Sequence, residues 1–498
     1  MGTDAIVAAD NPNKVVGAVY AVEGRKVPVL ASVVIDATGN GDVAFAAGAT
    51  PMYITASEIA VQGTGLPPKE LGGRYRNTDY TFVDETDIFD VTHVFVFAKE
   101  KFPNAFDLSR LIDTRERRRI LGDYVLTSLD QLNERTFPDT IVRARSDFDT
   151  HGYTIDPYLE LEHPNKKGFY SHLPYRTNLP KGLDGILVAG LATSCDRDAI
   201  PLMRMQPDLQ NQGYALGVVA ATAVKDGVAL RDVDIRKVQR ILVDVGNLAE
   251  TVLTDTDNYE SRRTGLTEAV KKLGESEEFE GASFIFWYPE EGKKLVREAF
   301  DRATDKKAKE IYAQVLAVMG DPVGIDLLIE KVKAYEKWDA GWNFVGMGQF
   351  GQALSPLDRL IIALGRAGDK RAVPVIVDKL NQLTHSHEFS HYRACSLALE
   401  MLGDKSAAPA LATALKKPGV MGYVHSSIEL AKKWDQADPR AATGEKSRRD
   451  SLLEIGLARV LYRLGDSEEK LGEKILADYA KNDLRGHFNR HARMVLAK

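Results

Sequence analysis

The first forty residues alternate between apolar runs and polar turns. The runs "DAIVAAD", "VVGAVYAV" and "VPVLASVVIDAT" are separated by polar residues at positions 11–14 and 23–26. Apolar runs of this length between turn residues predict strands. Because a meander of this kind needs a second layer to cover its apolar face, we expect these strands to form part of a larger α/β unit.

Residues 53–184 have a mixed pattern. The mostly apolar "VTHVFVFA" at residues 91–98 predicts a strand, and the charged run at residues 109–132, "SRLIDTRERRRILGDYVLTSLDQL", predicts a helix. A buried-strand pattern follows at residues 185–189, "GILVA", and ends at Gly190. It leads to "PDLQNQGYALGVVAATAV", a long helix rich in small residues. We therefore predict an α/β fold that includes a mixed α+β region.

After about Arg240 the pattern is helical throughout. The phrase "LAVMGDPVGIDLLIEKV" returns in altered form as "IALGRAGDKRAVPVIVDKL", "LALEMLGDKSAAPALATAL" and "VLYRLGDSEEKLGEKIL". Each phrase joins an apolar helix end, a Gly-Asp turn and a second amphipathic helix, with turns at Gly320, Gly368, Gly403 and Gly465. Helix pairs that recur in this way along the chain predict an all-α, HEAT-like solenoid. This architecture typically binds or braces other segments.

Within this helical half, Gly346, Gly348 and Gly351 spell G-x-G-x-x-G, the usual pointer to a dinucleotide site. The motif has that meaning where it follows a buried strand and opens directly into a helix. Here the charged and aromatic "YEKWDAGW" precedes it, and the next helix begins only at Ser355. We therefore interpret these glycines as a loop.

The same half contains His387, Glu388 and His391 in the order H-E-x-x-H, which on a helix places two imidazoles on one face for zinc. Ser386 and Ser390 favour a capped helix start, and no convincing third ligand follows. A catalytic zinc needs three protein ligands. We therefore expect a polar helix start and no metal site.

Composition excludes several classes of protein. Among 498 residues, 44% are hydrophobic and 27% charged, which is typical of globular domains. The net charge of -6 argues against a nucleic-acid partner, and no run of about 20 apolar residues predicts a membrane span. With only Cys195 and Cys395 and no signal peptide at the start of the sequence, we expect a reducing, cytoplasmic location.

A further glycine motif lies in "SVVIDATGNGDVAFAAGA", where Gly39, Gly41 and Ala44 fit G-x-G-x-x-A between a strand and a short helix. The acid that binds a ribose is expected about 20 residues later at the end of a second parallel strand. Glu58 lies instead in "TASEIAVQGTG", which has no strand pattern. The motif resembles the second glycine motif of two-dinucleotide-binding flavoproteins, in which a strand ending in A-T-G follows a β-meander.

Three later blocks extend this resemblance over roughly the first 240 residues. They are "IDTRERRRILGDYVLTSLD", "HLPYRTNLPKGLDGILVAGLATS" and "RMQPDLQNQGYALGVVAATA". In this order they resemble blocks of the FAD-dependent oxidoreductases related to the fumarate reductase flavoproteins. The resemblance implies an FAD cofactor bound by Thr38, Gly39, Gly41, Asp42, Gly190, Ser194, Gln206, Pro207, Asp208, Leu209, Gln210 and Gly213.

The helix after Pro207 is expected to present free N–H groups and a positive dipole end to the flavin. For the substrate side we predict Arg119, His151, Arg176 and Arg204 as catalytic residues, because guanidinium groups can clamp a carboxylate and an imidazole can transfer a proton. Further candidates for the substrate side are Arg118, Tyr175 and Arg197.

In the resembled family a strand–G-x-G-x-x-G–helix unit that binds the ADP half of FAD precedes the meander, and neither glycine motif here supplies it. We therefore expect a truncated form, or half of a split enzyme whose partner chain carries this unit. The helical repeats provide an alternative site for a protein partner.

The predicted domain order is a partial FAD-binding domain at residues 1–50 and 181–240, a substrate or cap region at 51–180, a helical linker at 241–300 and HEAT-like repeats at 301–498. The predicted function is hydride transfer between a small organic substrate and FAD. The alternative is a non-catalytic scaffold protein built on the helical repeats.

Overall fold

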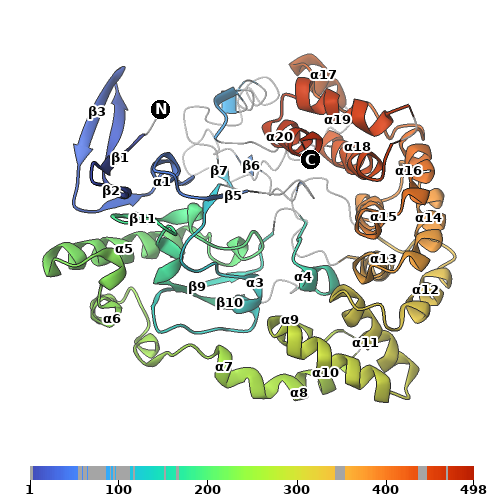
Figure 1. Ribbon diagram of the computed structural model, residues 1–498, viewed down its shortest axis with the longest axis horizontal. Helices are drawn as coiled ribbons and strands as arrows, with labels where there is room; N and C mark the ends of the chain where they lie inside the picture. The colour runs from blue at the N-terminus through green and yellow to red at the C-terminus, as the bar shows by residue number, and fades with distance from the viewer. Residues whose placement is uncertain are drawn as a thin grey trace, which may run out of the picture. The chain divides into compact units, whose positions relative to one another are not determined.

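The structure of the protein is a computed structural model (Figure 1). It describes residues 4–53, 59, 64–65, 86–89, 91–92, 96, 113–115, 118–150, 153–163, 168–276, 278–341, 354–435, 446–466 and 469–497. The G-x-G-x-x-G of residues 346–351 and the candidate His151 lie outside these described residues.

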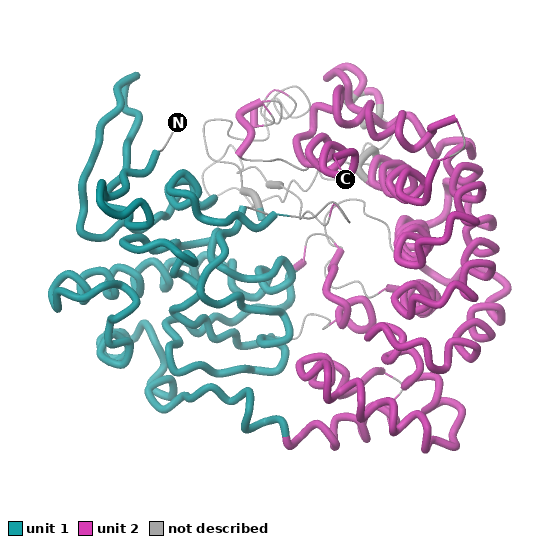
Figure 2. The backbone as a smooth tube through the Cα atoms, in the orientation of Figure 1, with its two compact units in different colours: residues 1–53, 115–149, 166–263 teal, residues 54–114, 150–165, 264–498 magenta. Residues whose placement is uncertain are grey.

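The chain forms two compact units, and both draw on separate stretches of sequence (Figure 2). Unit 1 contains residues 1–53, 115–149 and 166–263, and unit 2 contains residues 54–114, 150–165 and 264–498. Among the described residues, no helix is both long and apolar enough to cross a membrane.

Unit 1 begins with the predicted meander. Strands β1 (Asp4–Ala8), β2 (Asn11–Val22) and β3 (Arg25–Leu30) form an antiparallel sheet in the order β1-β2-β3. Glu23 and Gly24 connect β2 to β3 with φ values of 47° and 77°, the conformation that a tight two-residue hairpin turn requires. The structure confirms the three strands, although the third predicted run is divided between β3 and the separate strand β4 (Val34–Asp36).

Strand β11 (Ile186–Val188) pairs in parallel with β4 and is the buried strand that the sequence predicts. Its side chains alternate between two apolar clusters. Leu187 belongs to the cluster that contains the next two helices, whereas Ile186 and Val188 pack with residues of β2 and of α1 (Asp42–Ala46). A strand buried on both faces reads as a continuous apolar run, which is why "ILV" was recognisable.

The first cluster fills the space between two helices and a two-stranded sheet. Helix α5 (Gln206–Asp226) packs on α6 (Ile235–Asp244) and on β9 (Thr140–Asp147), which pairs with β10 (Gly168–Pro174). The predicted long helix is thus confirmed, and it ends at Gly227 with φ 66°. Shorter elements complete the described strands and helices of both units up to residue 263: β5 (Pro51–Met52), β6 (Thr64–Gly65), β7 (Asp113–Thr114), β8 (Arg119–Ile120), α3 (Ser128–Leu132), α4 (Pro157–Leu161) and α7 (Tyr259–Arg262).

Two sequence predictions in this part are wrong. The described residues of the expected strand at 91–98 are helical, and Val91 N donates to Asp87 O at 3.0 Å. Among the described residues of the expected helix at 109–132, β7, β8 and α3 are present, so of these residues only the last turn is helical. A surface helix would leave the guanidinium groups of Arg118 and Arg119 in water, but these residues are only 6% and 4% exposed because tertiary hydrogen bonds hold them.

From residue 264 onward every described element is helical, as the sequence predicts. The helices are α8 (Leu266–Glu275), α9 (Ala282–Trp287), α10 (Pro289–Arg302), α11 (Lys306–Val318), α12 (Ile325–Lys333), α13 (Pro356–Ala367), α14 (Val373–Gln382), α15 (Phe389–Leu402), α16 (Ala408–Leu415), α17 (Ile428–Asp435), α18 (Lys446–Arg463), α19 (Leu471–Asn482) and α20 (Gly486–Leu496). The four predicted Gly-Asp turns are confirmed by positive φ at Gly320, Gly368, Gly403 and Gly465.

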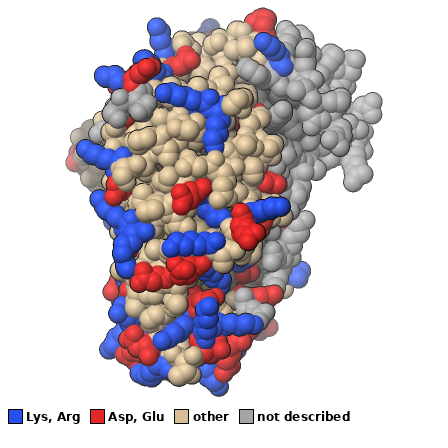
Figure 3. All heavy atoms as spheres, turned by 90° about the vertical axis from the view of Figure 1, so that its right-hand side faces the viewer, with Lys and Arg blue, Asp and Glu red and all other residues tan. Residues whose placement is uncertain are grey.

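Within unit 2 the helices form two layers. Helices α11, α13, α15 and α18 pack in succession against one another, while α12, α14 and α16 form a second layer on one side of them (Figure 1). The face of the molecule seen in Figure 3 carries basic and acidic side chains interspersed with uncharged ones. The assignment to the HEAT class stays a prediction.

The contact between α13 and α15 depends on a glycine. A Cβ atom at Gly365 would lie 2.4 Å from Ala398 Cα and 2.7 Å from Ala398 Cβ. Backbone atoms cannot move aside as the end of a flexible side chain can, so the two helices approach closely only because position 365 has no side chain.

We predict that Gly365→Ala destabilises unit 2 by about 1–3 kcal/mol, the usual cost of overpacking a core. The thermal unfolding midpoint should fall by several degrees. Gly456→Ala is the matched control, because Gly456 lies inside α18 and an added Cβ there would have no atom within 4 Å. That variant should be neutral or more stable, since alanine is the better helix former. Equal midpoints for both variants would contradict the prediction.

The H-E-x-x-H motif is interrupted by the start of a helix. Glu388 is the N-cap of α15, so His387 precedes the helix, and its Nδ1 accepts a hydrogen bond from Thr384 N at 3.0 Å. His391 is fully buried and contacts Asp358 Oδ1 through Nδ1 at 2.8 Å and Glu388 Oε2 through Nε2 at 3.3 Å. The two imidazoles therefore do not share a helix face, and the described residues contain no cluster suited to a metal ion.

The buried His391 is surrounded by acidic groups from three elements. Burial lowers its pKa, but the hydrogen bond to Asp358 and the charges of Asp358, Glu388 and Asp339 outweigh this and raise the pKa above its usual value. The ring also lies against Trp338, with centroids 4.3 Å apart. The folded state thus binds the proton of His391 more tightly than the unfolded chain does.

We predict that this histidine makes unit 2 less stable at alkaline pH. Its contribution is fully present below about pH 6.5, the pKa of an unfolded histidine, and is lost as pH rises through the higher pKa of the folded state. Thermal midpoints measured from pH 6 to 9 should fall more steeply for the wild type than for His391→Gln.

The same substitution at His387, which lies outside the buried cluster, is the control and should retain the wild-type slope. A wild-type slope in His391→Gln, or a flattened slope in His387→Gln, would show that His391 is not the responsible group.

Candidate functional site

The carboxyl ends of β4 and β11 define one edge of unit 1. Asp36 lies opposite Val188 in the parallel ladder, and Ala189 N donates to Asp36 O at 2.9 Å. The glycine-containing turns that follow the two strands therefore start side by side. Ligands of open α/β sheets bind outside the carboxyl ends of parallel strands, so this edge is the candidate site.

The buried carboxylate of Asp36 organises the first turn. Its Oδ1 accepts hydrogen bonds from Thr38 N at 3.1 Å and Thr38 Oγ1 at 2.7 Å, and its Oδ2 accepts one from Ala44 N at 2.9 Å. Thr38 Oγ1 in turn accepts from Asp42 N at 2.9 Å. The predicted cofactor residue Thr38 is thus committed to the turn itself. Asp36 was missed in the sequence, although an acid at the end of a strand before a glycine motif is a recognisable signal.

The two glycines of this turn have conformational and steric reasons to be glycine. Gly39 and Gly41 adopt φ values of 86° and 62°, in the left-handed region that side chains disfavour. A Cβ at Gly41 would also lie 2.5 Å from Cγ1 of Ile120. The motif therefore folds a tight turn over β8 whether or not a ligand is bound.

Arg118 closes the turn from the other side. Its Nε donates to Asn40 O at 2.8 Å, and its NH2 group pairs with Asp42 Oδ1 at 2.5 Å. The guanidinium carbon lies 4.1 Å from the centroid of the Phe45 ring. Arg118, a substrate-side candidate, and Asp42, a cofactor candidate, thus hold each other, and together they fix the turn.

A buried amide network holds the second turn. Gly190 has φ 78°, and its N–H donates to Gln212 Oε1 at 2.7 Å. Gln212 Nε2 donates to Thr193 Oγ1 at 2.8 Å, and Asn178 Nδ2 donates to Val188 O at 2.8 Å. This network joins α5 to the end of β11. Nothing in the local sequence marked Gln212 or Asn178, because their partners are distant in the chain.

The side of Gly190 that a side chain would occupy is open, with no atom within 4 Å of an added Cβ. The same holds for Gly213 in the second turn of α5. The neighbouring cofactor candidate Ser194 is fully buried, and its backbone N–H donates to Thr177 O at 3.0 Å. Of the candidates after β11, Gly190 and Gly213 thus have room beside them, and Ser194 lies beneath the surface.

Helix α5 begins with unused backbone donors. Its N-cap is Met205, whose side chain makes no capping hydrogen bond, and Pro207 stands in the first turn. Leu209 N donates to Met205 O at 3.0 Å, so the free first-turn amides are those of Gln206 and Asp208. Gln206, Pro207 and the following Gln210 are exposed, and Leu209 is half-buried.

The carboxylate of Asp208 is directed to the protein. Burial raises its pKa above the ordinary value, and a hydrogen bond from the backbone N–H of Arg145 on β9 acts in the opposite direction. The side chain therefore ties the first turn of α5 to the sheet, which leaves the backbone of this turn as the group able to meet a ligand.

Each arginine predicted for the substrate side has a partner inside unit 1. Arg119 Nε donates to Cys195 O at 3.1 Å, Arg176 Nε pairs with Asp139 at 3.0 Å, and Arg204 NH2 pairs with Asp149 at 3.2 Å. Arg204 lies two residues before the start of α5, and the Arg176 side chain is 42% exposed. The catalytic roles of these residues stay predictions.

The two other described candidates are also engaged. Tyr175 Oη donates to Leu230 O at 2.9 Å, and Arg197 pairs with Asp198 at 2.7 Å while only 3% exposed. Burial raises the pKa of the Tyr175 hydroxyl well above its usual range. Both residues thus serve the interior of unit 1.

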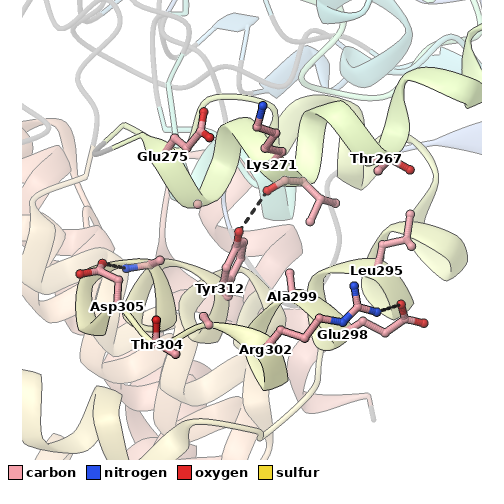
Figure 4. A pocket seen from close by; sticks show the side chains of 14 residues that line it. Thr267, Lys271, Glu275, Leu295, Glu298, Ala299, Arg302, Thr304, Asp305 and Tyr312 are labelled. Atoms are coloured by element: carbon pink, nitrogen blue, oxygen red, sulfur yellow. Dashed lines mark hydrogen bonds and ion pairs between the residues drawn. The ribbon is translucent and has the colours of Figure 1, made fainter.

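Unit 2 contains a pocket of about 480 Å³ that no sequence motif indicated (Figure 4). It lies between α8, α10 and α11, with the Tyr312 ring on one wall and Tyr312 Oη donating to Val270 O at 3.3 Å. Gly274 leaves room for this ring, since a Cβ there would lie 1.9 Å from Tyr312 Oη. At the rim, Glu298 and Arg302 pair at 2.9 Å. The lining carries both signs of charge, so it favours neither a cationic nor an anionic ligand.

Comparison with known proteins points to unit 1. Residues 85–242 match the family model described as FAD dependent oxidoreductase, and this stretch contains β9, β10, β11 and the second glycine turn, but not β4 and the first turn. No curated protein matches the chain. Among solved structures, the complex of CpcE and CpcF of phycocyanin lyase from Nostoc sp. PCC7120 matches with 22% identity over 40% of this chain and 74% of that chain. Its TM-score of 0.22 is too low to establish a shared fold.

The family match supports flavin-dependent oxidoreductase activity in general, with FAD as the cofactor. The matched residues include Gly190 and the first turn of α5, where the structure leaves open space and free amides. Residues 85–242 are thus similar to FAD-dependent oxidoreductases, and their glycine turn and helix start are the features suited to that cofactor.

Proposed function

We propose that unit 1 binds FAD at the carboxyl ends of β4 and β11 and that the protein transfers hydride between a small organic substrate and this flavin. One observation carries the proposal. Two glycine turns with positive φ stand side by side at the end of one parallel ladder, and an uncapped helix start follows the second turn. The family match over residues 85–242 supports the same assignment.

When bound, FAD supplies the site that accepts or donates the hydride, and its reduced form gains negative charge. The start of α5 suits this charge. The N–H groups of Gln206 and Asp208 have no acceptor within the helix, and the positive end of the helix dipole lies at the same place. Gly190 and Gly213 have open space beside them, since an added Cβ at either position would have no atom within 4 Å.

Among the residues proposed for the substrate, Arg204 has the most suitable position. It lies two residues before Gln206, and its ion pair with Asp149 fixes its direction. Arg176 retains partial exposure, whereas the burial of Arg119 makes a direct substrate contact unfavourable. We propose Arg204 and Arg176 as carboxylate-binding groups, with His151 as the candidate proton donor or acceptor.

We further propose that the ADP half of FAD is bound by a strand–G-x-G-x-x-G–helix unit outside residues 1–498, on a partner chain or a longer form of this one. Val34 and Asp36 direct their backbone groups to β11, so those of Ile35 face the opposite edge of β4. In the described part of the chain no strand pairs with that edge. A parallel strand added there would extend the sheet.

We predict that Gly190→Ala weakens FAD binding at least about tenfold, because a methyl group would occupy the space beside the candidate flavin position. Gly182→Ala is the matched control. Gly182 has φ 79° and the same open surroundings, but it precedes the other end of β11. The two variants should show similar losses of thermal stability, and only Gly190→Ala should lose affinity in a titration followed by FAD fluorescence.

Equal affinities of the two variants would place the flavin elsewhere. Failure of the wild type to bind FAD at any accessible concentration would favour the alternative, a non-catalytic interaction protein. That alternative draws support from unit 2, whose helices hold residues 153–163 through buried ion pairs.

We also predict that residues 1–498 alone bind FAD with micromolar or weaker affinity. Two missing charge-assisted hydrogen bonds from an ADP-binding unit would cost about 3–6 kcal/mol. Supplying such a unit fused before residue 1 or as a separate chain should strengthen binding by two or more orders of magnitude. Purification of the chain with one tightly bound flavin would contradict this expectation.

A further inference from the structure

The chain makes an excursion between two strands that are direct neighbours. Asp147 at the end of β9 pairs with Gly168 at the start of β10, so a short turn would suffice to join them. Residues 148–167 intervene instead, and residues 150–165 belong to unit 2 (Figure 2). Of the described residues in this stretch, 153–163 contain α4 and are mostly buried. An excursion of this length needs a reason other than connection.

Two arginines of unit 2 hold the centre of this segment. Glu160 is only 2% exposed, and its Oε2 pairs with NH2 of Arg366 on α13 at 2.6 Å. Its Oε1 pairs with NH2 of Arg393 on α15 at 3.2 Å. Guanidinium groups bind a carboxylate with defined geometry, so the two helices specify an acid at this position.

Unit 2 also contacts both ends of the segment. At the carboxyl end of α4, Arg359 donates to Leu161 O at 2.9 Å and lies 3.5 Å from Glu162 Oε2. At the other end, the Arg393 guanidinium carbon lies 4.5 Å from the centroid of the Tyr153 ring. The same Arg393 donates to Thr154 O at 3.1 Å. Arg359 and Arg393 therefore contact the end of a helix, a carboxylate and an aromatic ring of the segment.

Aromatic packing completes the contact. The Tyr153 ring lies 5.8 Å from that of Phe389, and the Tyr158 ring lies 6.0 Å from that of Phe286 on α9. Asp156 caps α4 by accepting from Tyr158 N at 2.9 Å, so the segment carries its own helix start signal. A helix of five residues is marginal in water even with a cap, so the contacts with unit 2 supply most of its stability.

We propose that the helical array of unit 2 is a receptor for a short acidic helix, and that residues 153–163 are its resident ligand. The recognition resembles that of a helix bound in a groove, with aromatic anchors and one fully desolvated carboxylate. Removing a partner from such a buried ion pair is strongly unfavourable, which makes the interaction selective for the acid.

A first test uses hydrogen exchange in the intact chain. Glu160→Gln keeps the shape of the side chain and removes its charge. Backbone amides of residues 158–163 should exchange at least about tenfold faster in this variant, while those of α13 and α15 keep their wild-type rates. Uniformly faster exchange throughout unit 2 would show that the segment is an integral part of the core and would overturn the proposal.

A second test supplies the segment as a separate molecule. A fluorescent synthetic peptide of residues 150–165 is titrated into the full-length wild type and into full-length Glu160→Lys, whose own segment is repelled by Arg366 and Arg393. The peptide should bind the variant at least about tenfold more tightly than the wild type, in which the position is occupied. The same peptide with glutamine at position 160 is the control and should bind the variant at least about tenfold more weakly than the native peptide.

Equal binding of the two peptides, or no binding to the variant, would overturn the proposal. If Glu160→Lys does not fold, the hydrogen-exchange result of Glu160→Gln decides by itself. Neither test depends on flavin, so both can fail or succeed independently of the function proposed for unit 1.

Discussion

The parallel pairing of β4 with β11 is the constraint on which the rest of unit 1 depends. Ile186, Leu187 and Val188 are all buried, and their side chains alternate between the cluster of the meander and that of α5 and α6. Because the ladder ends at Asp36 and Ala189, it fixes where both glycine turns begin. The position of the candidate site thus follows from the packing of one short strand, and α5 is joined to it through the hydrogen bond between Gly190 N and Gln212 Oε1.

Two buried carboxylates show how charge is used in the two units. Asp36 accepts three hydrogen bonds from groups within eight residues of it, so it shapes a local turn. Glu160 pairs with Arg366 and Arg393, which lie 206 and 233 positions away, so it attaches one segment to two distant helices. Both groups lose hydration on burial, and in both cases defined donors offset that loss. The first arrangement shapes the candidate ligand-binding edge, whereas the second attaches the segment that we propose as a ligand of unit 2.

The sequence motifs of this protein differ in how much they indicate about function once the structure around each is known. Gly39 and Gly41 fold a turn that is held by Arg118 and by the close approach of Ile120, so their presence is explained by backbone geometry alone. The H-E-x-x-H motif is divided because α15 starts after Glu388. A motif is informative when the elements around it are the ones its chemistry requires. At Gly190 a buried parallel strand precedes the glycine, and the uncapped helix α5 begins further along the chain at Gln206.

By itself, the sequence determined the features that arise within a few residues: the strands of the meander, the buried strand before Gly190, helix α5 and the glycine turns between the later helices. Apolar periodicity, helix caps and positive φ are local properties, so a short window contains the information. Only the tertiary structure decided that the charged run around Arg118 is not a helix, that Gln212 supports Gly190, and that Glu160 meets two arginines of unit 2. Each of these outcomes depends on a partner far away in the chain, and the pattern of one segment carries no information about the partner that folding brings to it.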